Sequence, residues 1–478
     1  MKNSVFKAAL ALLLACATLL PASCATVDPL ATSANVWNNT TKSTVESVTE
    51  STPDGGDYII RRPANVDLSE YDLGEDAGVG RYVDGDWMYI RRYGSSYFIY
   101  DKRIYLEKEL TTAYKYNIVT RACVPVCGDP VCRHSTNEET SECPFAGGFR
   151  LIAIDGDKLY FVSRYPSSED DSLTTYHPSI YVYNTKTLEK TYLFSSFRFM
   201  AEDDYFDLVD GKIYYVEDVL VGDYTFDRYL CAYELKSGKT ARLLKYDHYY
   251  FEDPSYISNT TVRYEHGLYI RSVASDGIAC FSTIPTPFKT TTEEGLEVWD
   301  TEKTRRVYTV DINDINTLRE VPNSDYNHGF VGMRKGKLYL LDRAEYETVL
   351  CDVTLYEVDV QSGEKRILEE NFTGSPLICG DTLIFIKENS LYMRNLETGK
   401  ERLFDLPACV EGELVKKADT GVGGYKDGRV FLNGFQYNGH EDDSDAEIVV
   451  FDLVTNQLYP LHYVFGSVFF QSRYKGEQ

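Results

Sequence analysis

The sequence lacks the motifs by which most enzyme families are recognised. It has no G-x-S-x-G stretch, which excludes a serine hydrolase domain of that type. His440 and Glu441 are not followed by a second histidine at zincin spacing. Residues 237–240 (S-G-K-T) end like a phosphate-binding loop, but Tyr233 stands where such a loop needs its first glycine. The sequence therefore contains no motif that would indicate a particular reaction.

Positive charge is also scarce. The chain has 49 Lys and Arg residues against 74 Asp and Glu, for a formal net charge of −25. A surface this acidic repels phosphate backbones, so we do not expect nucleic acid as a partner. Aromatic residues are abundant instead, with 39 Tyr and 23 Phe. These residue types favour β-strands.

Long apolar runs are missing except near the N-terminus. Residues 8–20 are apolar and follow Lys2 and Lys7. The run is too short to span a bilayer comfortably, so residues 1–24 are predicted to be a signal peptide. Pro-Ala-Ser-Cys at residues 21–24 resembles a bacterial lipobox, although Pro21 stands where Leu is usual. We expect Cys24 to be lipidated and to anchor the protein to the outer side of the bacterial cell membrane. Simple cleavage and secretion is the alternative.

Residues 25–57 are rich in Thr, Ser, Asn, Asp and Pro and have almost no periodic apolar positions. Such a segment cannot bury enough apolar surface to fold alone. It is predicted to be a disordered tether. The folded domain is then expected to cover residues 58–478.

One pattern recurs seven times between Val83 and Leu461: a polar turn with Gly leads into an apolar, Tyr-rich run, and a second run follows after a variable gap. The turns are V-D-G-D-W-M-Y-I (83–90), I-D-G-D-K-L-Y-F (154–161), V-D-G-K-I-Y-Y (209–215), E-H-G-L-Y-I (265–270), K-G-K-L-Y-L (335–340), C-G-D-T-L-I-F (379–385) and K-D-G-R-V-F-L (426–432). Repeats of this kind predict an all-β fold that is a single β-propeller. We expect four antiparallel strands per blade and seven blades, with eight as the alternative. Residues 58–62 and 464–474 are strand-like and are candidates for pairing across the closure.

Each repeat is predicted to contain strands A to D. The Gly turn joins A to B, and a second polar turn joins C to D. Because consecutive connections of an antiparallel sheet alternate between its two ends, the B–C and D–A connections share one face, here called the elaborated face. The long insertions are nearly all of these two types: residues 166–178, 222–227, 272–305, 342–352, 438–447 and the Cys-rich stretch after the first repeat. We expect ligand binding on this face, with neutral loop drift as the alternative.

These motifs resemble those of TolB-like and YncE-like propellers, and more closely those of Tyr-rich propeller lipoproteins of Gram-positive bacteria. The resemblance rests on the D-G-x-x-Y-F hairpins, L-Y-x-V-D-x-x-S-G-E at residues 355–364 and C-G-D-P-V-C-R-H at residues 127–134. It covers about residues 60–478. It implies a propeller on the cell surface and no settled activity, since these families mostly serve as interaction platforms.

A group of soft metal ligands lies in the connection after the first repeat. Cys127, Cys132, His134 and Cys143 offer three thiolates and one imidazole. This is the ligand set of a structural tetrahedral zinc site. A disulfide among the three cysteines is the rival hypothesis, because it suits an exported protein. A third alternative is neither metal nor disulfide.

Three aromatic residues mark a candidate ligand-binding segment. Phe281, Phe288 and Trp299 lie in the insertion of the fourth repeat, outside any predicted strand. Aromatic rings stack well on sugar rings and on apolar partner surfaces. We therefore predict a non-catalytic binding module for a protein or a cell-envelope glycan. One alternative is a polysaccharide-active hydrolase or lyase with carboxylates in the propeller funnel. Another is a scaffold lipoprotein without a small ligand.

Overall fold

The computed structural model describes residues 50–51, 57–58, 68–71, 73, 77–78, 83–94, 97–100, 103–106, 110–118, 123–132, 143–145, 149–163, 178–197, 205–251, 262–284, 287–291, 297–301, 304–343, 353–372, 374–387, 390–406, 414–437, 447–455 and 457–460. The chain divides into two units, Met1–Ile60 and Arg61–Gln478. In the first unit β1 (Glu50–Ser51) pairs with β2 (Asp57–Tyr58). Cys24 lies outside the described residues. Within these ranges no helix is long and apolar enough to cross a membrane.

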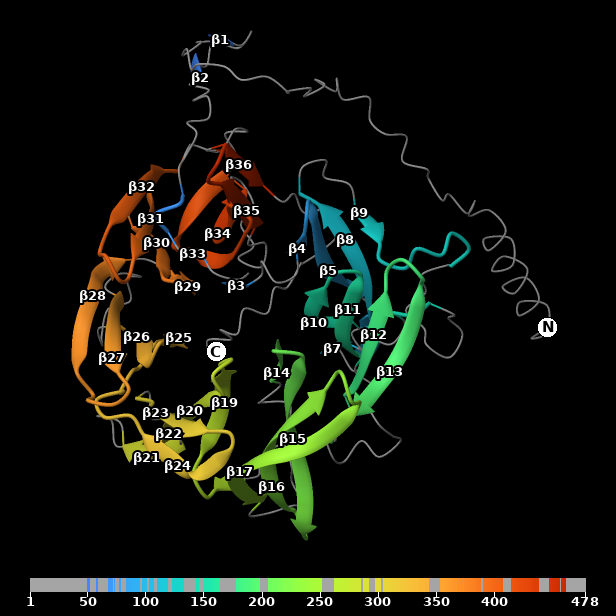
Figure 1. The fold of residues 1–478 in the computed structure, drawn as a ribbon, viewed down its shortest axis with the longest axis vertical. Coiled ribbons are helices and arrows are strands. Elements are labelled where there is room, and N and C mark those ends of the chain that lie inside the picture. Colours follow the sequence, from blue (N-terminus) through green and yellow to red (C-terminus); the bar gives the residue numbers. More distant parts are fainter. Residues whose placement is uncertain are drawn as a thin grey trace, which may run out of the picture. The chain divides into compact units, whose positions relative to one another are not determined.

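The described strands of the second unit form seven antiparallel sheets of four or five strands, numbered here in chain order (Figure 1). Sheet 1 contains β4 (Val83–Asp84), β5 (Trp87–Gly94), β8 (Leu110–Asn117) and β9 (Cys123–Pro125). Sheet 2 contains β10 (Arg150–Asp155), β11 (Lys158–Ser163), β12 (Ser179–Asn184) and β13 (Glu189–Ser195). Sheet 3 contains β14 (Phe206–Val209), β15 (Lys212–Gly222), β16 (Thr225–Glu234), β17 (Lys239–Phe251) and β18 (Val262–Tyr264).

The remaining sheets follow the same order. Sheet 4 contains β19 (Leu268–Val273), β20 (Ile278–Thr283), β23 (Val307–Asp311) and β24 (Asp314–Glu320). Sheet 5 contains β25 (Gly329–Arg334), β26 (Lys337–Arg343), β27 (Val353–Asp359) and β28 (Lys365–Phe372). Sheet 6 contains β29 (Leu377–Cys379), β30 (Thr382–Lys387), β31 (Ser390–Asn395) and β32 (Glu401–Asp405). Sheet 7 contains β3 (Ala77–Gly78), β33 (Leu414–Lys426), β34 (Arg429–Tyr437), β35 (Glu447–Asp452) and β36 (Gln457–Pro460).

The sheets follow one another around a ring. The inner strands of neighbouring sheets are in contact from β10 through β14, β19, β25 and β29 to β33. The first and last sheets also meet, because Arg429 of β34 donates to the Gly85 carbonyl at 3.0 Å and to the Asp86 carboxylate at 2.6 Å. In sheet 7, β3 pairs with Gly424 and Tyr425 of β33. The all-β propeller fold, built mostly from four-stranded antiparallel sheets, is therefore confirmed.

The predicted pairing between residues 58–62 and 464–474 stays a prediction, because residues 59–62 and 464–474 lie outside the described residues. Tyr58 itself pairs with Glu50. The segment that joins sheet 7 on its inner side is Ala77–Gly78. A short strand suffices there, because it adds to a 13-residue strand that already pairs with β34.

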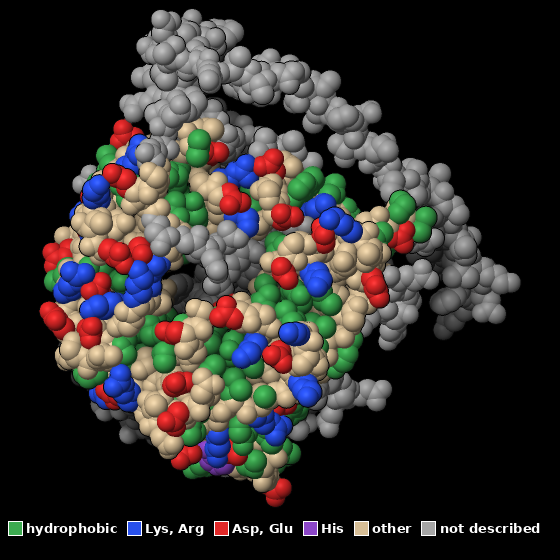
Figure 2. Space-filling model, viewed as in Figure 1, with side chains coloured by type: hydrophobic (Ala, Val, Ile, Leu, Met, Phe, Trp, Pro, Cys, Tyr) green, Lys and Arg blue, Asp and Glu red, His purple; other side chains and the backbone are tan. Residues whose placement is uncertain are grey.

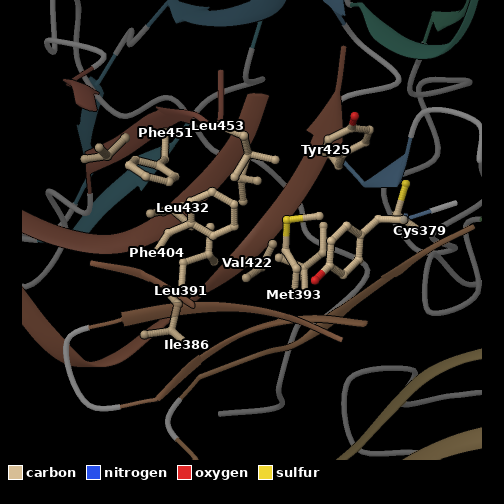
Figure 3. Close-up of a cluster of buried hydrophobic side chains, with 14 residues drawn as sticks. Cys379, Ile386, Leu391, Met393, Phe404, Val422, Tyr425, Leu432, Phe451 and Leu453 are labelled. Carbon is tan, nitrogen blue, oxygen red and sulfur yellow. The ribbon is translucent and has the colours of Figure 1, made fainter. Parts of the chain in front are cut away.

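Apolar clusters join each successive pair of sheets from 1–2 to 6–7. Their members come from alternate positions of the strands, as expected for half-buried β-structure. Figure 3 shows the cluster between sheets 6 and 7, where side chains of β31 and β32 meet those of β33, β34 and β35. It includes Leu391, Met393, Phe404, Val422, Leu432 and Phe451. Several tyrosines, among them Tyr183, Tyr246 and Tyr326, are buried to within 2% of full burial. Packing thus accounts for part of the Tyr excess.

Six of the seven predicted A–B hairpins are confirmed. In three of them both turn residues have positive φ, as in Asp210–Gly211 (49° and 72°), which is the type I′ geometry that fits strand twist. The A–B hairpin predicted for the fourth repeat is wrong. Residues 262–264 form β18, which pairs with β17 of sheet 3 and not with Leu268–Val273. The A–B turn of sheet 4 lies after Ala274 and contains Gly277, with φ +83°.

The contrast between the two faces is largely as predicted. The A–B and C–D connections are two to five residues long. Two B–C connections carry an extra hairpin: β6 (Tyr97–Tyr100) with β7 (Arg103–Leu106), and β21 (Pro287–Thr291) with β22 (Glu297–Thr301). The predicted insertion at residues 222–227 is wrong, because β15 and β16 continue as strands and turn at Gly222–Thr225. That hairpin extends toward the elaborated face.

Candidate functional site

The hairpin of β15 and β16 extends sheet 3 beyond the neighbouring sheets. These strands have 11 and 10 residues, and β17 beside them has 13. Their pairing continues to Gly222↔Thr225 and Thr225↔Tyr250. In Figure 1 the end of β15, in green, projects at the lower rim of the ring. The hairpin therefore carries side chains away from the body of its sheet.

A buried ion pair stabilises the middle of this hairpin. Asp218 and Arg228 are register partners on β15 and β16, with the Asp218 Oδ1 and Arg228 Nε atoms 2.9 Å apart and side chains 0% and 1% exposed. The ring of Tyr249 lies 4.8 Å from the guanidinium carbon. Tyr249 also stacks on Phe226 with ring centroids 5.2 Å apart. This small core packs the middle of the hairpin against β17.

A second buried carboxylate connects the hairpin to the next sheet. Asp247 of β17 pairs in register with Arg228 and is 1% exposed. It accepts backbone N–H bonds from His248, His266 and Leu268 at 2.8, 3.1 and 2.8 Å. Burial raises the pKa of Asp247, while these N–H groups and Arg228 oppose the rise. Since Leu268 begins β19, Asp247 fixes the start of sheet 4 against sheet 3.

Three polar side chains of β16 and β17 pair with one another below the hairpin tip. Asp227 Oδ1 lies 2.7 Å from His248 Nδ1 and 2.8 Å from Lys245 Nζ. Partial burial raises the pKa of Asp227, but hydrogen bonds from Lys245 and His248 outweigh it and hold the pKa below its ordinary value. The carboxylate is therefore charged at neutral pH. Below the tip residues, Asp227 is thus paired with Lys245 and His248.

The tip carries several exposed apolar side chains beside the exposed Asp223 of the turn. Leu220, Val221, Tyr224 and Tyr250, here called the tip residues, are 60%, 52%, 37% and 46% exposed. Exposed apolar side chains on outer strands elsewhere, such as Tyr192, Ile367 and Leu403, lie on three different sheets. Single residues of that kind are ordinary on protein surfaces, whereas several at the end of one hairpin are a candidate contact surface. Leu220 and Val221 are consecutive strand residues, so this surface includes both sides of the hairpin. Figure 2 shows acidic and basic side chains intermingled over the visible face, without a patch of one sign.

Three of the four predicted metal ligands come together. The Sγ atoms of Cys127, Cys132 and Cys143 all lie within 4.8 Å of one another, and the thiols are not bonded to each other. His134, the fourth, lies outside the described residues. A local turn causes the approach of the first two: Asp129 Oδ1 accepts the N–H of Val131 at 2.9 Å, and the Asp129 carbonyl accepts that of Cys132 at 3.2 Å. This cluster of three cysteines can hold a metal ion.

The cysteine cluster is part of the core between sheets 1 and 2. Cys127 and Cys143 are 6% and 5% exposed, and they pack with Phe145, Phe149, Phe161 and Tyr183. Burial raises the pKa of Cys127, and it raises that of Cys143 to about 12. These cysteines therefore do not add to the exposed binding surface that was expected of the Cys-rich connection.

The predicted aromatic segment differs from expectation. Phe281 lies in β20 and is 0% exposed, with its ring 4.7 Å from that of Tyr246 between sheets 3 and 4. Phe288 and Trp299 lie in β21 and β22, which pair as a hairpin. The expectation that the three residues lie outside any strand is therefore wrong. Ligand contact by Phe288 and Trp299 stays a prediction, while Phe281 belongs to the core.

Sequence reasoning missed the tip residues. The run V-L-V-G-D-Y-T-F at residues 219–226 contains apolar residues around a Gly-Asp turn. That pattern is also typical of a buried hairpin, so only the length of β15 and β16 reveals the exposure. In the described ranges, the three cysteines are the only group of three or more His, Cys, Asp or Glu side chains placed to hold a metal.

No protein-family model matches the chain, and no curated protein matches it. Solved structures do. The β-propeller domain of the Trilobed protease from Pyrococcus furiosus matches with a TM-score of 0.40 and 10% identity, over 80% of this chain and 97% of that one. Acylaminoacyl peptidase from Pyrococcus horikoshii matches with 0.38 and 10%, over 65% and 45%. Dipeptidyl peptidase 4 from Porphyromonas gingivalis matches with 0.34 and 12%, over 84% and 56%. No specific family is assigned, and the likeness to TolB-like and YncE-like propellers stays a prediction.

Proposed function

We propose that this protein is a non-catalytic interaction propeller that binds a partner through its elaborated face. The observation that carries the proposal is the exposed apolar tip of the β15–β16 hairpin, formed by Leu220, Val221, Tyr224 and Tyr250. A group of aliphatic and Tyr side chains suits the apolar centre of a protein interface, where such residues act as anchors. We therefore favour a protein partner in the cell envelope over an envelope glycan.

The hairpin is suited to this role because it is ordered before binding. The Asp218–Arg228 pair and the Phe226–Tyr249 stack fix its middle. Binding then costs little additional chain ordering, which otherwise subtracts from affinity. Full burial of an aliphatic side chain such as Leu220 contributes about 1.5–3 kcal/mol. Two aliphatic and two Tyr side chains thus suffice for a specific contact when the surrounding surface is complementary.

The test replaces tip residues with a residue that keeps strand propensity. The variant is Leu220→Thr, Val221→Thr and Tyr224→Thr combined, and the matched control is Tyr192→Thr, Ile367→Thr and Leu403→Thr. The full chain is immobilised and titrated with detergent-solubilised envelope proteins of the native host and, separately, with protein-free wall glycan. We expect the tip variant to lose at least about tenfold in affinity for a protein component, and the control to keep it. Equal binding by wild type and tip variant would contradict the proposal.

The setting of this function is part of the same proposal. We infer that each of the seven sheets is one blade of a closed propeller, and that a lipid on Cys24 holds it outside the cytoplasmic membrane. The lipobox-like residues 21–24 and the polar segment at residues 25–57 support the anchor. Cys24→Ala should release the folded protein from membranes in cell fractionation. Unchanged membrane retention would count against the anchor, and sheets that do not circle one axis in an experimental structure would overturn the blade count.

A further inference from the structure

The inference concerns the core between sheets 1 and 2, away from the proposed binding tip. Cys127, Cys132 and Cys143 bring three sulfur atoms into one triangle, each pair within 4.8 Å. A disulfide requires only two sulfurs, and it would leave the third thiol beside it without a role. Convergence of all three from two separate segments is what a metal site needs. We propose that Cys127, Cys132 and Cys143 bind one Zn²⁺ ion as thiolates, as a structural site that ties sheet 1 to sheet 2.

The spacing of the sulfurs fits this ion closely. Zn–S bonds are about 2.3 Å long, so thiolates around a tetrahedral zinc are about 3.8 Å apart. The triangle therefore has to contract by about 1 Å at most from the 4.8 Å limit. Cys132 is partly exposed, and this gives the ion a route of entry. The two other sulfurs are buried and are held by the core around them.

The backbone before the cluster is already folded for such a site. Val126 donates its N–H to the Ala113 carbonyl of β8 at 3.0 Å, which fixes the approach of Cys127. The turn at Asp129 then returns the chain to Cys132. Gly128 lies so near to Leu188 of sheet 2 that an added Cβ would come within 2.9 Å of Leu188 Cδ2. The segment between the first two ligands thus lies against the β12–β13 turn of sheet 2.

A buried hydroxyl beside the cluster points to the same conclusion. Tyr183 of β12 is 0% exposed, and its hydroxyl has only a poorly aligned contact with the Gly128 backbone. It belongs to the same buried apolar cluster as Cys127 and Cys143. A buried hydroxyl without a partner is costly. Thiolates bound to a metal accept hydrogen bonds, and the Tyr183 hydroxyl can then donate to one of them.

The chemistry of the site follows from its donors. Thiolates select Zn²⁺ over hard cations such as Mg²⁺ or Ca²⁺, and three of them leave one tetrahedral position for a fourth ligand. As each S–Zn bond forms, the thiol proton passes to solvent, so three protons are released and nothing is oxidised. Among the described residues no fourth His, Cys, Asp or Glu side chain joins this group. Two of the three sulfurs are buried in the core between sheets 1 and 2, so the site is structural.

The experiment measures metal and thiols on the same sample. The full chain is purified without chelators, its zinc is measured by elemental mass spectrometry, and its thiols are titrated after denaturation with chelator present. We expect one zinc per chain and, with Cys16 removed and Cys24 lipidated, the nine other cysteines as free thiols. Removal of zinc and titration with Co²⁺ should give the near-ultraviolet charge-transfer bands of cobalt thiolates. A zinc-free protein lacking two thiols would show a disulfide, and a zinc-free protein with all thiols would show neither; both overturn the proposal.

Variants locate the ion. Cys132→Ser changes the most exposed ligand, and Cys280→Ala removes a fully buried thiol of another sheet as the matched control. Tyr183→Phe removes only a hydrogen bond to a ligand and should lower zinc affinity about 10–100-fold. Cys132→Ser removes a ligand and should lower it more than that. Circular dichroism identifies any variant that fails to fold. Unchanged zinc content and cobalt bands in folded Cys132→Ser would refute the assignment.

Discussion

The contact between sheets 4 and 5 offers a quantitative test with a built-in control. Gly363 lies in the C–D turn of sheet 5 at φ +70°, and an added Cβ would lie 2.6 Å from Pro322 Cβ and 2.9 Å from the Pro322 carbonyl oxygen. Asn323 Nδ2 donates to the Gly363 carbonyl at 2.8 Å, which holds the two segments together. Gly336 has the same φ of +70°, but nothing lies within 4 Å of its added Cβ.

Both alanine substitutions therefore have the same backbone cost, and only one has a steric cost. The left-handed conformation costs an L-residue about 1–2 kcal/mol, which is the full effect expected for Gly336→Ala. Gly363→Ala should lose about 1–3 kcal/mol more, as is typical of overpacking against a rigid neighbour. Urea unfolding followed by Tyr fluorescence measures both. Equal losses of unfolding free energy in the two variants would refute the close approach of these sheets.

Two further predictions concern ion pairs. Glu369 accepts bonds from Lys387 at 2.5 Å and Arg394 at 2.6 Å between sheets 5 and 6, so Glu369→Gln should lose about 1.5–3 kcal/mol at pH 7. Desolvation raises the pKa of Glu369, but these bonds outweigh it and hold the pKa below the ordinary 4.5. The stabilisation by Glu369 is therefore present above pH 4.5 and is lost as the pH falls through the lowered pKa. A stability difference between wild type and Glu369→Gln that persists in acid would contradict this. Asp218→Asn should cost about 3–5 kcal/mol in thermal or urea unfolding, because it leaves the Arg228 charge buried. Asp218→Leu with Arg228→Met should cost less, and equal losses would show that the charge is not desolvated.

The fold could be predicted from the sequence because its hairpins are local. Turns such as Asp210–Gly211 adopt positive φ, and Gly or Asp next to an apolar run marks that geometry before any long-range contact is known. The exception is instructive. Gly267 also has positive φ, at +59°, yet the strand before it pairs with β17. Two turns, at Gly267 and Gly277, suit an A–B hairpin equally, and the choice depends on the 13-residue length of β17.

The candidate sites could be predicted only in part, for a related reason. The approach of Cys127 to Cys132 follows from a turn within a few residues, whereas the position of Cys143 depends on packing against sheet 2. Burial of Phe281 could not be predicted from the sequence, because an aromatic residue shortly before Pro285 and Pro287 suits a loop as well as a strand end. Exposure of Leu220 was equally hidden, since an apolar residue in a strand is expected to be buried.

The central claim is that the hairpin tip contacts a partner, and site-specific photo-crosslinking in the native host tests it most directly. A photoreactive phenylalanine analogue is introduced at Tyr224, which is 37% exposed at the tip, and in a second strain at Tyr192, which is 54% exposed on β13. Both positions present an aromatic ring to solvent, so intrinsic reactivity is matched. The proposed function predicts a discrete adduct with one envelope protein from position 224 and none from position 192. Adducts from position 192 alone, or from neither position, would contradict it.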